Sequence, residues 1–116
     1  MNNLTGIKEL CGPIFQKIGQ EVLDVSSQKG FTYDDDSQVI ALIHSEVSEA
    51  LEALREPYMK PSDHIPDFNN LEEEMADIVL RTMAYCARNN LRLADAMMAK
   101  IEYNRNRSFQ HGGKRF

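Results

Sequence analysis

Apolar residues recur every three or four positions through most of this 116-residue chain, which is the spacing of one face of an α-helix. The clearest run lies within residues 37–55, where the steps are four, four, three and four: Val39, Ile43, Val47, Ala50 and Leu54. No segment shows the alternation of apolar and polar residues that is typical of a half-buried β-strand. The sequence therefore predicts an all-α fold with this stripe in its core.

Capping residues divide the chain into four helices. Gly30 suits the end of the first helix, Asp36 or Ser37 can cap the second, and Asn69 or Asn70 can cap the third. The predicted helices span residues 13–29, 37–55, 71–88 and 93–108. Because each helix has an apolar face that must be buried, we expect a four-helix bundle. Apolar residues on more than one side of the second and third helices further predict a homodimer or a dimer of dimers.

The length favours a single domain covering residues 1–116, with a mobile tail at about 109–116. No apolar run approaches the roughly 20 residues that cross a bilayer, so we expect no membrane partner. The chain also does not start with the pattern of an export signal, which predicts a cytoplasmic protein. Cys11 and Cys86 form no CxxC pair, so we expect two buried thiols and neither a disulfide framework nor a zinc knuckle.

Charge is distributed unevenly along the chain. The formal net charge of −5 argues against a protein that coats nucleic acid, because that role needs a broad basic face. Residues 44–77 carry ten acids against two bases, whereas the last twenty residues carry five bases and one acid. This polarity suits a metal ion beside phosphate groups. The alternative is that both regions are ordinary solvated helix faces.

Two pairs of acids carry the chemical prediction. Glu46 and Glu49 project from nearly the same side of the second helix, and Glu74 and Asp77 repeat this spacing on the third. If these helices are antiparallel neighbours, four carboxylates converge around one or two hard divalent cations, for which Mg²⁺ is the natural choice. A di-iron bundle would instead need Glu-x-x-His pairs, and no histidine lies three positions after a glutamate.

Polar residues on the fourth helix form a row that continues into the tail: Lys100, Asn104, Arg107 and His111. Two permanent cations and an amide suit phosphate oxygens, and Gly112-Gly113 lets Lys114 fold back toward an anion. Taken alone, such a row is most often a solvated helix face.

These motifs resemble, in order, those of the all-α nucleoside triphosphate pyrophosphohydrolases, the superfamily of MazG-like proteins, dimeric dUTPases and phosphoribosyl-ATP pyrophosphohydrolase. Residues 46–49 are similar to the family's ExxE motif, and residues 74–77 are similar to its ExxD motif. Lys100, Asn104 and Arg107, with the His-Gly-Gly-Lys tail at 111–114, are similar to its closing row of polar residues. The resemblance covers roughly residues 13–116. The single-domain length resembles the short MazG-like members.

The resemblance implies an enzyme that binds Mg²⁺, with Mn²⁺ as a substitute, through Glu46, Glu49, Glu74 and Asp77. It implies hydrolysis of a nucleoside triphosphate between the α- and β-phosphates, giving the monophosphate and pyrophosphate, as in nucleotide-pool house-cleaning. The general base is either Glu49 or Glu73.

The remaining roles follow the same hypothesis. Lys100, Asn104 and Arg107 are expected to bind the phosphates, and His111 and Lys114 to close over them. Phe15, Phe31 and Tyr33 are candidates for stacking on the base, although aromatic residues at such positions more often belong to the core. Two alternatives remain open: a phosphoribosyl-ATP pyrophosphohydrolase-like enzyme, and a non-enzymatic helical module that binds a nucleotide or a partner helix.

Overall fold

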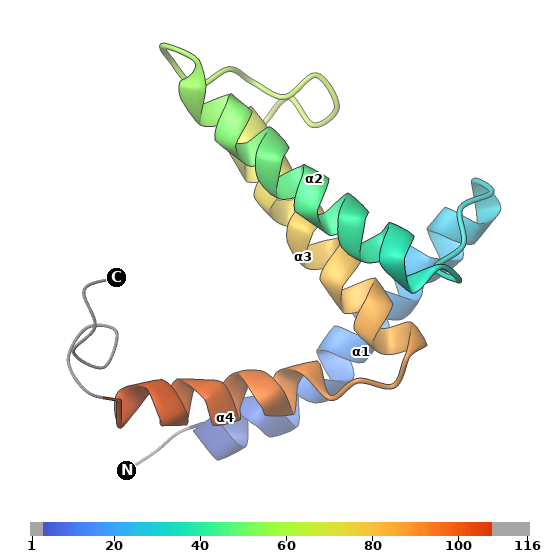
Figure 1. Cartoon of the computed structure of the whole chain (residues 1–116), viewed down its shortest axis with the longest axis vertical. Helices are drawn as coiled ribbons and strands as arrows, with labels where there is room; N and C mark the ends of the chain where they lie inside the picture. The colour runs from blue at the N-terminus through green and yellow to red at the C-terminus, as the bar shows by residue number, and fades with distance from the viewer. Residues whose placement is uncertain (1–3, 108–116) are drawn as a thin grey trace.

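The computed structural model describes residues 4–107, which fold into four helices without a β-strand (Figure 1). The helices are α1 (Leu4–Gln28), α2 (Asp36–Arg55), α3 (Asn70–Arg88) and α4 (Leu93–Arg105). The all-α prediction is therefore confirmed. None of these helices is both long and apolar enough to cross a membrane, over the part of the chain that the structure describes.

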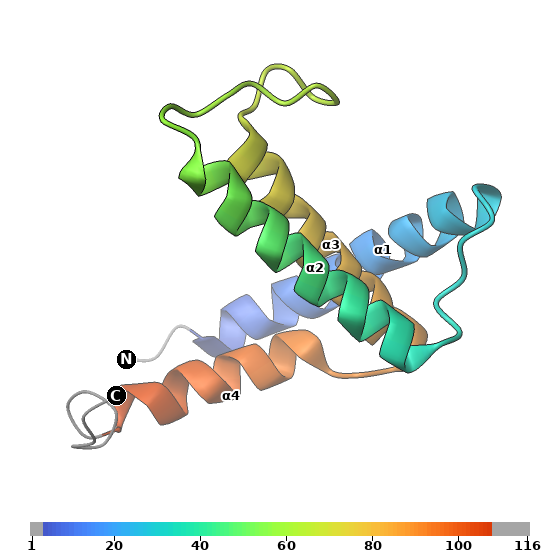
Figure 2. The same cartoon turned by 45° about the horizontal axis from the view of Figure 1, so that its top comes forward.

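The helices form two crossing pairs. α2 and α3 lie antiparallel, side by side, and α3 also crosses α1, while α4 packs along α1 (Figures 1 and 2). Figure 2 shows that α2 and the N-terminal half of α3 extend beyond this crossing as a two-helix arm. The molecule is therefore a bundle in which α1 and α3 make the central contact.

The prediction for the start of the first helix was wrong. α1 begins at Leu4, and Pro13, the predicted start, lies inside it. A proline in a helix interior removes one backbone hydrogen bond and usually bends or ends the helix. Here α4 packs along the N-terminal half of α1, and this tertiary contact stabilises the turns before the proline (Figure 1).

The other helix ends follow from local capping. Asp35, one residue before the predicted candidates, caps α2 by accepting a hydrogen bond from the backbone N–H of Gln38 at 3.1 Å. Asn69 caps α3 as predicted, and it forms a reciprocal capping box with Glu72. α4 ends at Arg105, three residues before its predicted limit at Ser108, which lies outside the described residues.

The core is small and lies near the crossing of the helices. Its buried centre consists of Tyr33, Val39 and Ala84, against which Val22, Leu23, Phe31, Ile43 and Tyr85 pack. The stripe predicted on α2 is only partly buried, because Val47 and Leu54 are exposed. Both lie on the two-helix arm, where α3 is the neighbour of α2 and α1 does not reach (Figure 2).

The contact between α1 and α3 is unusually close at Gly19. A Cβ atom built there would lie 2.5 Å from the carbonyl oxygen of Met83 and 2.7 Å from the Cβ of Ala87. The facing residues Ala84 and Ala87 are small and buried. Glycine is therefore required at this crossing for packing rather than for backbone freedom.

The two cysteines are free thiols and each is only partly buried, so the prediction that both are buried was too strong.

Candidate metal centre

The antiparallel packing of α2 and α3 brings three of the four predicted acids into one cluster. Carboxylate oxygens of Glu46, Glu74 and Asp77 lie within 4.8 Å of one another. Glu49, three residues after Glu46, interacts with the carboxylates of both Glu46 and Glu74. The spacing of three on each helix places each pair on one face, and the helix packing joins the two faces.

Two oxygens in this cluster are buried without a partner. Glu46 is only 8% exposed, and its Oε1 accepts a hydrogen bond from Arg81 Nε at 3.3 Å. Its Oε2 and the Oε2 of Glu74 are buried and have no hydrogen-bond partner among the described residues. A buried carboxylate oxygen without a partner is costly, and a bound cation would satisfy it. All four donors are oxygens, a set that fits a hard divalent cation.

The electrostatics of the cluster favour protonation while no cation is bound. Burial is the main cause of a raised pKa for Glu46, Glu74 and Asp77. For Glu74, burial together with the neighbouring carboxyl groups of Glu46 and Glu49 raises the pKa to about 8. A divalent cation would reverse this effect, because it stabilises the ionised carboxylates.

The metal-free protein should lose stability as the pH rises from about 5 to about 8. In this range the folded state holds protons that the unfolded carboxylates have released, because the pKa of Glu74 is about 8 instead of 4.5. The free energy of unfolding therefore falls with rising pH, by about 3 kcal/mol or about 12 °C in Tm. Thermal melts across this pH range measure the effect.

Two further measurements identify its source. Mg²⁺ added at pH 8 should restore the lost stability, because it binds the ionised cluster. The Glu74→Gln variant should show a flatter dependence on pH in the absence of metal. A wild-type Tm that is constant over this range would contradict a cluster of buried, mutually repelling carboxylates.

Arg81 belongs to the site and was missed by the sequence analysis. It donates to Glu46, as described above, and its guanidinium carbon lies 6.0 Å from the ring centroid of Phe31. The sequence does contain a signal that places Arg81 at the site, because Arg81 follows Asp77 by four residues and therefore shares its helix face. Arg81 links the acids to the segment between α1 and α2.

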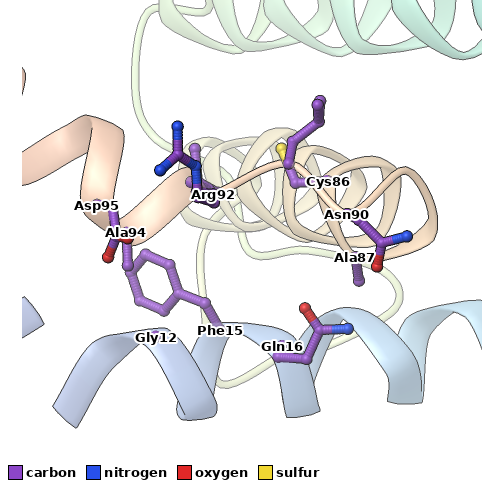
Figure 3. Close-up of a pocket in the computed structure, with 11 residues that line it drawn as sticks. Gly12, Phe15, Gln16, Cys86, Ala87, Asn90, Arg92, Ala94 and Asp95 are labelled. Carbon is purple, nitrogen blue, oxygen red and sulfur yellow. The ribbon is translucent and has the colours of Figure 1, made fainter. Parts of the chain in front are cut away.

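The three aromatic candidates for base binding lie in different surroundings. Phe31 is partly buried and packs edge to face on Tyr33, with ring centroids 5.1 Å apart. Tyr33 is 3% exposed and belongs to the core. Phe15 lines a pocket of about 260 Å³ formed by α1, the C-terminal end of α3 and the start of α4 (Figure 3). Of the three, Phe31 is joined to the acids through Arg81.

Three residues of the predicted phosphate-binding row, Lys100, Asn104 and Arg107, are described by the structure, and they do not lie beside the acids. Lys100 and Arg107 flank the ring of Tyr103, with Lys100 Nζ 4.4 Å and the Arg107 guanidinium carbon 6.0 Å from its centroid. Asn104 is exposed on the same helix. Because α4 runs along α1, its C-terminal end lies away from the two-helix arm in both views (Figures 1 and 2). His111 and Lys114 lie outside the described residues.

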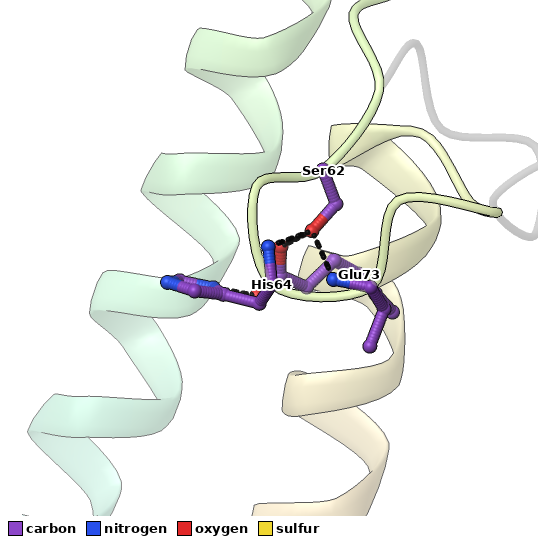
Figure 4. A network of polar contacts seen from close by, with 4 residues as sticks. Ser62, His64 and Glu73 are labelled. Atoms are coloured by element: carbon purple, nitrogen blue, oxygen red, sulfur yellow. Dashed lines mark hydrogen bonds and ion pairs between the residues drawn. The ribbon is translucent and has the colours of Figure 1, made fainter.

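A polar network fixes Glu73, the second candidate for the general base (Figure 4). Ser62 Oγ donates a hydrogen bond to Glu73 Oε1, and His64 Nδ1 lies 2.6 Å from Glu73 Oε2. These two bonds lower the pKa of Glu73. The network was not predicted, because it depends on how the proline-containing loop between α2 and α3 folds back onto α3.

Comparisons of the chain with family models, with curated proteins and with solved structures gave no match.

Proposed function

We propose that this chain is a magnesium-dependent nucleoside triphosphate pyrophosphohydrolase, which cleaves the substrate between its α- and β-phosphates and releases pyrophosphate. The observation that carries the proposal is the convergence of Glu46, Glu74 and Asp77, with Glu49 beside them, and the two buried oxygens without a partner. The order of the motifs, similar to that of the all-α pyrophosphohydrolases, supports the reaction class. Such an enzyme would serve nucleotide-pool house-cleaning in the cytoplasm.

All four acids would bind the metal ion in this proposal, and Glu49 would have a second role as proton acceptor. Glu46, Glu74 and Asp77, together with Glu49, would hold Mg²⁺ or its substitute Mn²⁺. The bound cation would neutralise the triphosphate and lower the pKa of the attacking water. Glu49 is the better acceptor for the proton of that water, because both oxygens of Glu73 are already hydrogen-bonded and its pKa is lowered.

A second copy of the chain would complete the site in this proposal. Lys100, Asn104 and Arg107 would bind the phosphates from a neighbouring subunit, since within one chain α4 lies along α1. Apolar side chains left exposed on the two-helix arm support association: Val47, Leu51, Leu54, Met75 and Val79. Light scattering should give at least twice the chain mass of 13.3 kDa. A stable monomer would contradict a shared site.

The decisive experiment measures pyrophosphate release from a panel of ribo- and deoxynucleoside triphosphates, with and without Mg²⁺. We expect release from at least one of them, with the monophosphate as the other product, and none after chelation of the metal. Phosphoribosyl-ATP belongs in the panel, because preferential turnover of this compound would identify the alternative enzyme. No turnover of any member would favour a helical module that binds without catalysis.

A further inference from the structure

The loop between α2 and α3 places a histidine at the acidic site. His64 Nδ1 lies 2.6 Å from Glu73 Oε2, and Glu73 is one helical turn before Asp77 on α3. Glu73 also immediately precedes Glu74, so its bond holds the imidazole at the part of α3 that carries both acids of the cluster. Apart from its bond to Glu73 the side chain is open to solvent, with 81% of its surface exposed.

The loop holds this histidine in place through Ser62. Ser62 is 2% exposed, and its Oγ accepts hydrogen bonds from the backbone N–H groups of His64 and Ile65, each at 3.0 Å. The same hydroxyl donates to Glu73 (Figure 4). A buried hydroxyl that ties two loop amides to a helix carboxylate makes this part of the loop rigid. The position of His64 relative to α3 is therefore fixed before any ligand binds.

The bond to Glu73 also decides which ring nitrogen of His64 is available. A carboxylate accepts a hydrogen bond, so Nδ1 carries a proton in this pair and Nε2 is turned outward. Glu73, Asp63 and Asp77 raise the pKa of His64, with the Glu73 bond as the largest cause. The outward Nε2 carries a proton only in the imidazolium form, which these carboxylates favour, and it is then a charge-assisted donor of the type that binds a phosphate oxygen.

We propose that His64 Nε2 donates a hydrogen bond to a phosphate oxygen of the substrate, and that Glu73 and Ser62 position the ring for this contact. The inference rests on the proposed function for the nature of the ligand, a phosphate chain held beside the four acids. His64 would thus be an anion-binding group from the same chain as the acids. Arg81, the other cation whose charge affects the pKa of Asp77, is already paired with Glu46.

Two substitutions separate the outward contact from the bond to Glu73. Asparagine at this position carries an amide near the place of Nδ1, so His64→Asn keeps a donor to Glu73 and loses the outward donor. Glutamine carries its amide near the place of Nε2, so His64→Gln keeps the outward donor. Asp67→Asn, at an exposed site in the same loop, is the matched control.

The test is calorimetric binding of inorganic triphosphate in the presence of Mg²⁺, together with kcat and KM for the best substrate. For His64→Asn we expect the Kd and the KM to rise roughly 10-fold or more, because a charge-assisted bond is lost. The Tm and the affinity for Mg²⁺ alone should be unchanged. His64→Gln should bind more tightly than His64→Asn, and the control should match the wild type.

Wild-type affinity for triphosphate in His64→Asn, or a weaker affinity in His64→Gln than in His64→Asn, would overturn the proposal. The binding measurement needs no turnover, so it distinguishes the two proposals. If no nucleotide is hydrolysed and His64→Asn still weakens triphosphate binding, the contact stands and the proposed reaction fails.

Discussion

The Glu49→Ala variant should lose metal-dependent pyrophosphate release by roughly 1,000-fold or more, because it removes both a carboxylate of the site and the favoured proton acceptor. The fold should be unaffected. Glu49 is exposed on α2, and alanine is the best helix former. Its charge raises the pKa of both Glu46 and Glu74, so its removal also relieves repulsion in the metal-free cluster. We therefore expect a metal-free Tm equal to or above that of the wild type.

The matched control is Glu52→Ala, three residues further along the same helix. The Glu52 side chain is 64% exposed and forms an ion pair with Arg55 at 3.1 Å, an interaction worth less than about 1 kcal/mol. This variant should retain activity and fold normally. Steady-state assays and circular dichroism of both variants complete the test. Normal turnover in helical, purified Glu49→Ala protein would show that the four-acid site is wrong.

The Gly19→Ala variant should be strongly destabilised, in contrast to substitution of a glycine with free space around it in α1. The added methyl group would meet the Met83 carbonyl oxygen at 2.5 Å and the Ala87 Cβ at 2.7 Å, so α1 and α3 would have to move apart. We expect a loss of about 2–3 kcal/mol in the free energy of unfolding and about 10 °C in Tm. This loss outweighs the gain of about 1 kcal/mol in helix propensity that alanine brings.

Gly6→Ala on the same helix is the control, because nothing beyond the neighbouring residues lies within 4 Å of a Cβ atom at that position. Here the helix propensity of alanine acts alone, and we expect a gain of about 0.5–1 kcal/mol. Chemical denaturation of both variants gives the comparison. If Gly19→Ala were as stable as Gly6→Ala, the close crossing of α1 and α3 would be refuted.

The boundaries of α2 and α3 could be predicted to within about one residue, because caps and apolar spacing act within one or two turns. The start of α1 could not. Whether the segment before Pro13 stays helical depends on the contact with α4, and no local signal reports that contact. The exposure of Val47 and Leu54 has the same origin, since a stripe indicates which face is apolar but not how far its neighbours extend.

The acidic cluster could be predicted further than the rest of the site. The ExxE and ExxD spacings place each pair of acids on one helix face, and an antiparallel arrangement is enough to make the pairs meet. Arg81 lies on the same face and was within reach of the same reasoning. The position of His64 could not be predicted in this way. It depends on a loop whose residue Ser62 is hydrogen-bonded to Glu73, eleven positions later in the chain.

Residue spacing within single helices was therefore sufficient to predict the helical class and the two pairs of acids, each on one face of its helix. The tertiary structure decided the other features: the burial of Glu46, the bond between His64 and Glu73, and the packing of α4 along α1 instead of beside the acids. The physical reason is the range of the interactions. Caps and periodicity act over one or two turns, whereas crossings and loop anchors depend on side chains that meet only after the chain has folded.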